Sequence, residues 1–330
     1  MAAFQEIELK LKAAGANWAP TAAFFTDHPD YTILSQQTQE FEALYYDTNA
    51  RDLAKESMTF RVRREGDRWI ATSKGRGDET HGLHVRQEWN VEVQGPEPDL
   101  RCFAHLEIGS ELVRLVGERP LEALFKTRFE RSATLLQTPA GSVVELAIDR
   151  GQIIAGEKSV PIQEIEIELK SGHPQDVINL GAELAAVYPL RPEKKTKYSR
   201  GVELAGLKKL QTELAEKREN TQAPKPWELD PLSSLMVFFK ALEDYFTHGE
   251  RETDQRIIRQ ETQNILRWLG VAAELYESER AEITAALAYW RRIEETVEQL
   301  PQGPLYEGSY TAYLLKFWGW LISMRQMKAT

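Results

Sequence analysis

Charged and apolar residues alternate in the segment EIELK at residues 6–10. Glu6, Glu8 and Lys10 occupy every second position, which places them on one face of a β-strand. Carboxylates in such a row can bind a hard divalent cation through oxygen, and a lysine can bind phosphate or neutralise the acids. The same letters return at residues 166–170, so two distant strands are predicted to present acids.

Other segments with period-two alternation carry further charged sets. Acids are concentrated in the first and last segments, and arginine or lysine in those between, as a site for a metal-bound polyanion requires. Each set alone also fits the solvated face of an antiparallel sheet, in which opposite charges pair across strands. The remaining sets are Arg61 and Arg63; Thr72 and Lys74; Arg86 and Glu88; Glu145 and Asp149; and Glu164, Glu166 and Glu168.

The strands that must position these residues predict the fold of residues 1–204. Their alternation, with glycine-containing turns between them, predicts an antiparallel sheet or barrel, whereas PTAAFFTDH (20–28) and HPQDVINLGAELAAVY (173–188) predict helices. A barrel with the charged face inward needs a hydrated lumen in which the charges compensate one another, because burying them dry is costly. The predicted class is α+β.

From residue 205 the sequence changes to helical spacing. Residues 205–229 contain a helical segment and a proline-containing linker, and residues 230–330 predict a small all-α bundle. Its four amphipathic segments begin at Leu232, Glu252, Ala273 and Tyr310.

The 330-residue chain has a globular composition and a net charge of −10, which argues against general nucleic-acid binding but allows a local basic site. Cys102 is its single cysteine, so an intrachain disulfide and a cysteine-based zinc site are excluded. No secretory signal pattern opens the chain, and the apolar run at 313–324 is interrupted by Lys316 and Gly319. We expect a cytoplasmic protein with no membrane contact.

Together, the motifs of residues 1–204 resemble the CYTH superfamily of triphosphate tunnel metalloenzymes, specifically its inorganic triphosphatase branch. The EIELK segment at 6–10 matches the ExExK signature of that family, and the other motifs follow in family order. The resemblance implies an eight-stranded antiparallel β-tunnel with flanking helices, which hydrolyses inorganic triphosphate to pyrophosphate and phosphate with Mg²⁺ or Mn²⁺. The other motifs are LYYDT (44–48), FRVRRE (60–65), ATSKG (71–75), HVRQEWNVEV (84–93), FKTRFERS (125–132), VELAIDRGQIIAG (144–156), EIEIELKSG (164–172) and TKYSRG (196–201).

The resemblance also implies roles for single residues. The metal-facing acids are Glu6, Glu8, Glu166 and Glu168, with Glu164 as a further candidate. Glu88, Glu145 and Asp149 resemble acids that orient the basic residues or bind a second metal ion, and none is identified as the base that activates water. The phosphate clamp comprises Lys10, Arg61, Arg63, Lys74, Arg86, Arg131, Lys197 and Arg200, of which the first four join Glu88 as catalytic candidates.

The helical region resembles a shortened CHAD domain, a module associated with phosphate-rich polymers, so polyphosphate is a candidate partner. It contains one histidine, His248, which is interpreted as a helix-end residue rather than a ligand. Its arginines alternate with acids and are interpreted as a solvated face, with a polyphosphate-binding stripe as the alternative. They are Arg256, Arg259, Arg267, Arg291 and Arg292; the tryptophans interpreted as core or interface anchors are Trp227, Trp268, Trp290, Trp318 and Trp320.

Three alternative functions would use the same tunnel. A thiamine triphosphatase or an adenylate cyclase would need an added pocket for the organic group, which the sequence does not identify. A non-catalytic polyphosphate-binding scaffold would not need so many carboxylates. The sequence leaves the oligomeric state open.

Overall fold

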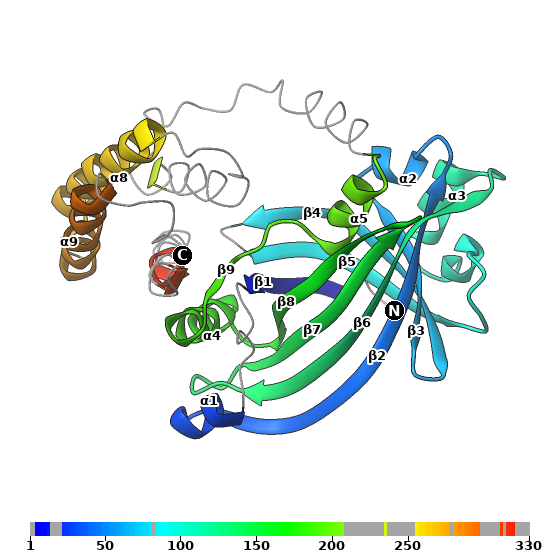
Figure 1. The fold of residues 1–330 in the computed structure, drawn as a ribbon, viewed down its shortest axis with the longest axis horizontal. Helices are drawn as coiled ribbons and strands as arrows, with labels where there is room; N and C mark the ends of the chain where they lie inside the picture. Colours follow the sequence, from blue (N-terminus) through cyan, green and yellow to red (C-terminus); the bar gives the residue numbers. More distant parts are fainter. Residues whose placement is uncertain are drawn as a thin grey trace. The chain divides into compact units, whose positions relative to one another are not determined.

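The computed structural model describes residues 4–13, 22–80, 83–207, 234–235, 255–277, 280–297, 311–312 and 315–320. The chain divides into two compact units. The first unit comprises residues 1–181 and 192–220, and the second comprises residues 182–191 and 221–330. The strands of the first unit carry most of the motifs found in the sequence (Figure 1).

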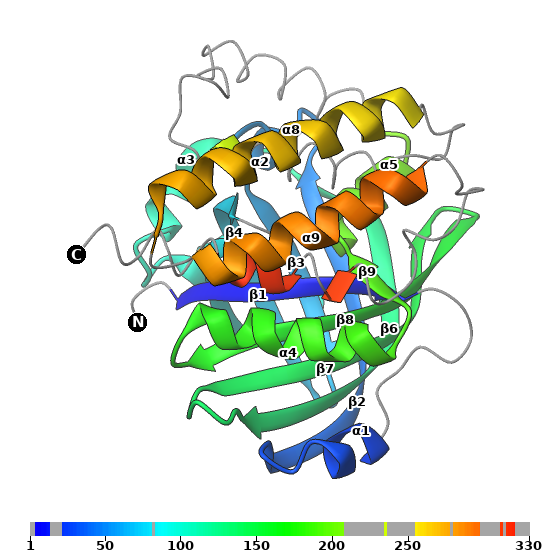
Figure 2. The same cartoon turned by 90° about the vertical axis from the view of Figure 1, so that its left-hand side faces the viewer.

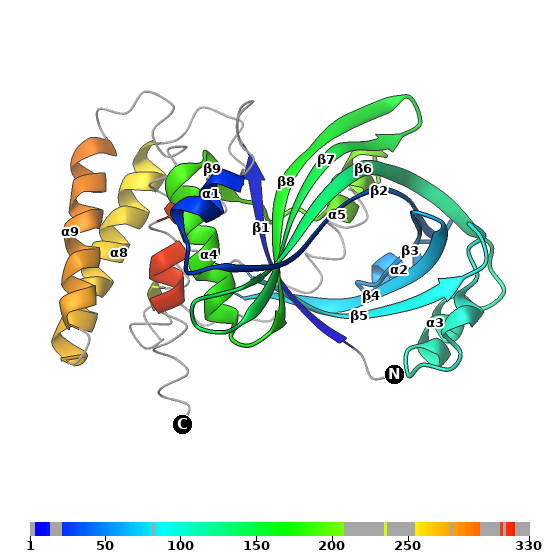
Figure 3. The same ribbon diagram turned by 90° about the horizontal axis from the view of Figure 1, so that it is seen from below.

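In the described part of the chain, nine strands form one sheet in the order β5-β4-β3-β2-β6-β7-β8-β1-β9. β5 also pairs antiparallel with β1, which closes eight strands into the predicted antiparallel barrel and leaves β9 as an extra strand (Figure 3). The α+β class is therefore confirmed. The strands are β1 (Phe4–Ala13), β2 (Thr32–Thr48), β3 (Thr59–Glu65), β4 (Arg68–Thr80), β5 (Leu83–Val93), β6 (Leu121–Gln137), β7 (Val143–Ala155), β8 (Lys158–Ser171) and β9 (Leu190–Pro192).

Period-two alternation gives the barrel an apolar outer face and a charged inner face on β3. Phe60 and Val62 are buried in an outer core cluster, whereas Arg61 and Arg63 line the lumen. Full burial of a large apolar side chain contributes roughly 1.5–3 kcal/mol, so the outer core stabilises the barrel while its interior stays polar. The helices that contribute to this cluster are α2 (Asp52–Lys55), the 3₁₀ helix η1 (Leu100–Phe103) and α3 (Gly109–Val116).

Helix α5 (Lys197–Leu204) packs against inward-facing aromatic residues of the barrel. Thr196 caps its N-terminus by accepting a hydrogen bond from the Ser199 backbone N–H at 3.1 Å. Val202 joins an apolar cluster that includes Phe125, and a Cβ at Gly201 would lie 2.2 Å from the Phe125 ring. This close approach requires glycine and directs the first turn of α5 toward the lumen.

The sequence pattern predicts some of these elements and misses others. The helices expected at 20–28 and 173–188 are confirmed as α1 (Ala22–Asp27) and α4 (Pro174–Val187). The alternation does not predict the full 17-residue length of β2, because residues 32–38 are polar or exposed on both faces. The short helices α2, η1, α3 and α5 also go unpredicted, since four to eight residues are too few to show a clear 3.6-residue period.

In the second unit, α8 (Gln255–Leu275) and α9 (Arg280–Val297) lie side by side (Figures 1 and 2). Both helices bury apolar residues three or four positions apart, Ile265 and Leu269 on α8 and Ile283 and Ala286 on α9. The prediction that a helix begins at Ala273 is wrong. α8 continues through Gly270 and Ala273 to Leu275, because a glycine inside a helix lowers its stability only modestly and does not end it.

Part of what the sequence predicts for the second unit can be compared with the structure. Trp290 and Trp318 are buried, as expected of core anchors, and Arg267 is exposed. The linker, Trp227, His248 and most of the helix predicted from Leu232 lie outside the described residues. The CHAD-like character and the domain boundaries stay predictions. None of the helices in the described ranges has the length and hydrophobicity to cross a bilayer.

One stability prediction follows from the contact between β6 and β7. A Cβ at Gly151 would lie 2.2 Å from the Arg128 carbonyl oxygen and 2.4 Å from the Phe129 Cα, both backbone atoms that cannot rotate away. We therefore expect Gly151→Ala to lower the free energy of unfolding by about 1–3 kcal/mol, measured by urea denaturation. Gly270→Ala is the control, because open space surrounds this position on α8. An equal loss in both variants would contradict the steric explanation.

Candidate active site

The charged faces of the strands meet in one cavity of about 440 Å³ in the first unit. Most of the predicted site residues line it: Glu6, Glu8, Lys10, Arg61, Arg63, Lys74, Arg86, Glu88, Arg131, Glu145, Glu166, Glu168 and Lys197. Asp149, Glu164 and Arg200 do not line the cavity but form ion pairs directly behind it. The barrel thus brings acids of β1 and β8 together with bases of β3 to β6.

The cavity has a basic excess although the whole chain has a net charge of −10. Its lining residues among those the structure describes comprise nine bases and seven acids, since Arg68 and Lys170 join the predicted bases and Glu65 joins the acids. A local basic excess inside a water-filled cavity attracts anions, whatever the sign of the total charge. The geometry therefore suits a polyanion.

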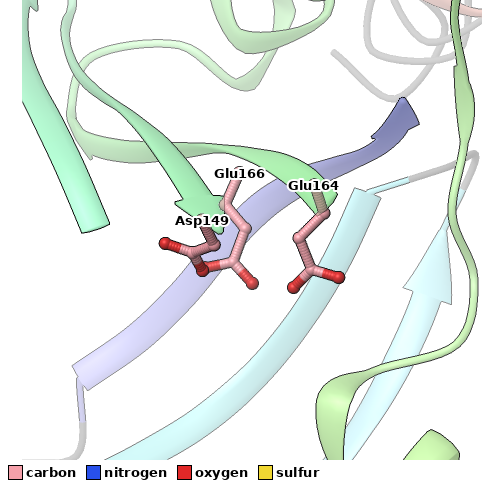
Figure 4. A group of neighbouring side chains, drawn as sticks. All are labelled: Asp149, Glu164 and Glu166. Carbon is pink, nitrogen blue, oxygen red and sulfur yellow. The ribbon is translucent and has the colours of Figure 1, made fainter. Parts of the chain in front are cut away.

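Asp149, Glu164 and Glu166 form a buried acidic cluster between β7 and β8, with one carboxylate oxygen of each within 4.8 Å of the others. Figure 4 shows the three side chains extending to the same side of the sheet. The Lys197 ammonium group lies among them, 2.6 Å from Asp149 Oδ2 and 2.9 Å from Glu166 Oε1. Although burial opposes ionisation, Lys10 and Lys197 hold the pKa of Glu166 well below its usual range.

Further bases neutralise this acidic cluster. Arg131 donates to both carboxylate oxygens of Asp149 at 2.7 Å, and Arg200 donates to Glu164 at 2.6 Å. Lys10 pairs with Glu166 from the neighbouring strand. Each acid of the cluster therefore already has a cationic partner, and a metal ion here would have to displace Lys197.

Glu6 and Glu88 share a single ammonium group. Lys74 Nζ lies 2.7 Å from Glu6 Oε1 and 2.7 Å from Glu88 Oε2, and Glu88 also accepts a hydrogen bond from Asn90 at 2.8 Å. Burial raises the pKa of Glu6 to about 7 even with Lys74 beside it. Lys74 and Arg61 instead hold the pKa of Glu88 below its ordinary value, despite its burial. Glu6 is consequently the less compensated acid of the two.

A second row of acids crosses three strands. The pairing register places Glu8 of β1 opposite Glu168 of β8, and Glu168 opposite Glu145 of β7. Glu8 Oε1 is buried without a hydrogen-bond partner among the described residues, and burial raises the pKa of Glu168 although Lys170 lies 2.8 Å away. Glu168 is therefore under-compensated, as expected of an acid that binds a divalent cation. Lys10 at 2.8 Å and Arg86 at 3.6 Å instead hold the pKa of Glu8 below its ordinary value, despite its burial.

Arg61 is the cation of the cavity with the fewest protein partners. Its Nε is buried and has no hydrogen-bond partner in the described part of the chain, and its Nη1 donates to the Tyr45 hydroxyl at 3.3 Å. Burial would raise the pKa of Tyr45, but the Arg61 charge lowers it. Arg61 lines the cavity and forms no ion pair with a carboxylate in the described ranges, so its guanidinium charge can bind an anionic ligand.

Arg63 is the neighbouring cation on the same face of β3. Burial and the Arg61 charge lower the pKa of Arg63 to about 10. Its Nε donates to Glu65 Oε1 at 2.7 Å, and its guanidinium carbon lies 4.9 Å from the centre of the Phe41 ring. Phe41 stacks in turn on Phe129, 5.4 Å between ring centroids, which gives the cations a rigid support.

Several lining residues were not predicted from the sequence. Glu65 continues the alternation of Arg61 and Arg63, so the period-two pattern contains the signal for it. Tyr45 lies opposite Arg61 in the β2–β3 register, which the motif alone cannot reveal. The other unpredicted members are Gln37, Gln39, Phe41, Thr59, Arg68, Asn90, Phe129, Ala133, Lys170, Thr196 and Tyr198.

The raised pKa of Glu6 predicts a pH dependence of stability in metal-free protein. A raised pKa means that the folded state binds the Glu6 proton more tightly than the unfolded state, whose value is near 4.5. This contribution to stability is complete below about pH 4.5 and is lost as the pH rises through about 7. We expect the wild-type melting temperature in EDTA to fall more between pH 5 and pH 8 than that of Glu6→Gln. Parallel curves for the two proteins would contradict this assignment.

Parts of the chain are similar to known proteins. A curated inorganic triphosphatase of Haemophilus influenzae is 35% identical over 175 residues, which cover 53% of this chain and 48% of the relative. The chain thus matches about half the length of that protein. Among solved structures, a putative adenylyl cyclase of Hippeastrum, described as having a dominant triphosphatase activity, is 19% identical with a TM-score of 0.43, covering 60% of this chain and 95% of its own.

A second structure, a putative adenylate cyclase of Vibrio parahaemolyticus, is 11% identical with a TM-score of 0.35 and covers 60% of this chain and 97% of its own. The CYTH domain model matches residues 5–202, which include the strands and the α5 turn that line the cavity. This match spans more than half of the chain and agrees with the resemblance carried by the motifs. The chain therefore belongs to the CYTH family.

Proposed function

We propose that the chain hydrolyses inorganic triphosphate to pyrophosphate and phosphate inside the barrel, with a divalent metal ion, Mg²⁺ or Mn²⁺, held by its acids. The observation that carries the proposal is Arg61, a cation of the cavity lining without a carboxylate partner among the described residues, in the same cavity as the under-compensated acids Glu6 and Glu168. Cationic donors on one wall and oxygen ligands on another are what a metal-bound phosphate chain needs. The curated triphosphatase relative supports the same reaction.

In this proposal Arg61 and Arg63 bind the oxygens of the phosphoryl group that is transferred. Lys74, Arg86 and Arg131 bind the other phosphoryl groups of the triphosphate. Their positive charges also keep the carboxylates of the cavity ionised. An attacking water oxygen bonds to a terminal phosphorus, the bond from that phosphorus to the bridging oxygen breaks, and pyrophosphate leaves. Fixed guanidinium groups lower the barrier by neutralising the charge that spreads over the phosphoryl oxygens.

In this proposal Glu6, Glu8 and Glu168 hold the divalent metal ion, with Glu145 beside Glu168 in register. Among the described residues, the carboxylates that already lie close enough to share one ion are Asp149, Glu164 and Glu166, but Lys197 neutralises them. Glu8 contributes an oxygen without a hydrogen-bond partner among the described residues, and burial raises the pKa of both Glu6 and Glu168. A metal ion bound there would neutralise phosphate oxygens and the three acids together. Asp149 and Glu166 are assigned instead to holding Lys10, Arg131 and Lys197 in place.

A substrate panel tests the proposed reaction. We expect the purified full chain with Mg²⁺ or Mn²⁺ to release phosphate fastest from inorganic triphosphate, and more slowly from thiamine triphosphate, ATP and long-chain polyphosphate. The cavity lining is dominated by charged side chains, which favours a substrate without an apolar organic group. Cyclic nucleotide formed from ATP would favour a cyclase, and tight binding of polyphosphate without turnover of any substrate would favour a scaffold.

We also propose that the protein acts in the cytoplasm, where thiols stay reduced. Burial raises the pKa of the Cys102 thiol to about 11, which keeps this single cysteine in its unreactive protonated form. A polyphosphate-binding role of the helical unit is a separate proposal, which depends on the exposed Arg267, Arg291 and Arg292.

A further inference from the structure

Glu65 is an acid of the cavity that belongs to none of the three sets of carboxylates described above. It is the last residue of β3 and lines the cavity together with Arg61 and Arg63. Residues two apart on a strand project from the same face roughly 7 Å apart. The face of β3 therefore presents two cations and then an anion, in a line toward the β3–β4 turn.

The partners of Glu65 are both arginines. Its Oε1 accepts hydrogen bonds from two nitrogens of Arg63, one of them at 2.7 Å, and its Oε2 lies 3.8 Å from Arg68. The Arg68 side chain is 61% exposed, whereas the Arg63 side chain is 16% exposed. Glu65 thus connects a buried cation of the cavity to a cation at its solvent side.

Two neutral side chains lie at this end of the cavity, together with the exposed Arg68. Gln37 and Gln39 line it from β2, and a Cβ at Gly66 would lie 3.2 Å from the Gln39 amide nitrogen, which places that amide beside the turn. Anions that extend past Arg63 would therefore meet the Glu65 carboxylate and neutral amides, with Arg68 as the one cation beside Glu65 at the solvent side among the described residues. Juxtaposed like charges at a binding interface weaken binding and so discriminate between ligands.

We propose that Glu65 limits the length of the phosphate chain that the tunnel accepts, admitting triphosphate and excluding chains that extend beyond Arg63. The inference rests on the proposed function. A triphosphate bound to Arg61 and Arg63 replaces Glu65 as the anionic partner of Arg63, and Arg68 retains the displaced carboxylate. A fourth phosphoryl group along this line would lie against Glu65, and the repulsion would weaken binding.

The alternative is that Glu65 only holds Arg63 in position. These two roles predict different results for Glu65→Gln, which keeps the shape and one hydrogen-bond acceptor but removes the charge. Loss of positioning alone would lower kcat/KM for every chain length by the same factor. Loss of a length filter would raise kcat/KM for tetraphosphate relative to triphosphate.

The test compares tri- and tetraphosphate in wild type, Glu65→Gln and Glu92→Gln, by hydrolysis with Mg²⁺ and by calorimetric binding. Glu92 is the matched control, because it lies 3.9 Å from Arg68 but does not line the cavity. We expect the tetraphosphate-to-triphosphate ratio of kcat/KM to rise at least tenfold in Glu65→Gln and to stay unchanged in Glu92→Gln. An unchanged ratio in Glu65→Gln, or an equal rise in both variants, overturns the inference.

The two readouts separate this inference from the proposed function. If wild type hydrolyses triphosphate and Glu65→Gln leaves the ratio unchanged, the length filter alone is wrong. If wild type binds both chains without hydrolysing either, the proposed function is wrong, and the ratio of dissociation constants decides the role of Glu65. Wild-type protein that binds neither chain overturns both.

Discussion

Replacing Arg61 with alanine should lower kcat/KM for inorganic triphosphate by about 10²–10³-fold while the protein stays folded. The structure explains both parts of this expectation. Arg61 lines the cavity and forms no ion pair with a carboxylate of the described residues, so it can bind an anion there and its removal leaves no acid without an ion-pair partner. Steady-state kinetics and circular dichroism of the purified variant measure the two parts.

Two further variants sharpen this test. Arg61→Lys keeps the charge but loses the forked donors, so its kcat/KM should lie between those of wild type and Arg61→Ala. Lys74→Ala should also lose turnover, but it leaves Glu6 and Glu88 without their shared cation and should lower stability as well. Full turnover in a well-folded Arg61→Ala protein would reject the role assigned to Arg61.

Removing divalent metal with EDTA should abolish turnover, and Glu168→Gln should raise the Mg²⁺ concentration for half-maximal activity at least tenfold. Glu168 lies opposite Glu8 in the strand register, and burial raises its pKa, so a bound cation relieves an unfavourable charge there. Loss of one oxygen ligand weakens a hard-cation site directly. A Mg²⁺ titration of the initial rate measures the shift.

Glu164→Gln is the matched control on the same face of β8. Glu164 is paired with Lys197 and Arg200, so its loss should lower the melting temperature and leave the Mg²⁺ requirement close to that of wild type. The opposite pattern is a higher Mg²⁺ concentration for half-maximal activity in Glu164→Gln and an unchanged one in Glu168→Gln. That result would assign the metal ion to the cluster of Asp149, Glu164 and Glu166. Turnover that persists in EDTA would contradict metal dependence itself.

The residues that line the lumen were predictable because charged and apolar residues alternate along the strands with a period of two. Arg61 and Arg63 alternate with Phe60 and Val62, and alternation must put the two pairs on opposite faces of a strand. Closing the sheet between β1 and β5 then brings Glu6 toward Lys74, a contact between residues 68 positions apart. Hydrophobic patterning thus determined which residues face inward.

The partnerships inside the lumen were not predictable from the same pattern. The sequence groups Glu166 with Glu6 as acids of one kind, but Lys197 reaches Glu166 from α5, a helix too short to predict from periodicity. The pairing of Tyr45 with Arg61 depends on the β2–β3 register, which the length of the connection between the two strands helps to fix. Whether an acid has a cationic partner depends on its neighbours in the folded protein. Acids that look equivalent in the sequence can therefore differ in charge compensation.

A crystal structure with Mn²⁺ and a non-hydrolysable triphosphate analogue tests the proposed site most directly. We expect the analogue inside the barrel, with its phosphoryl oxygens on Arg61 and Arg63, and anomalous scattering from Mn²⁺ beside Glu6, Glu8 and Glu168. An analogue bound outside the barrel, or Mn²⁺ among Asp149, Glu164 and Glu166 with Lys197 displaced, would contradict it.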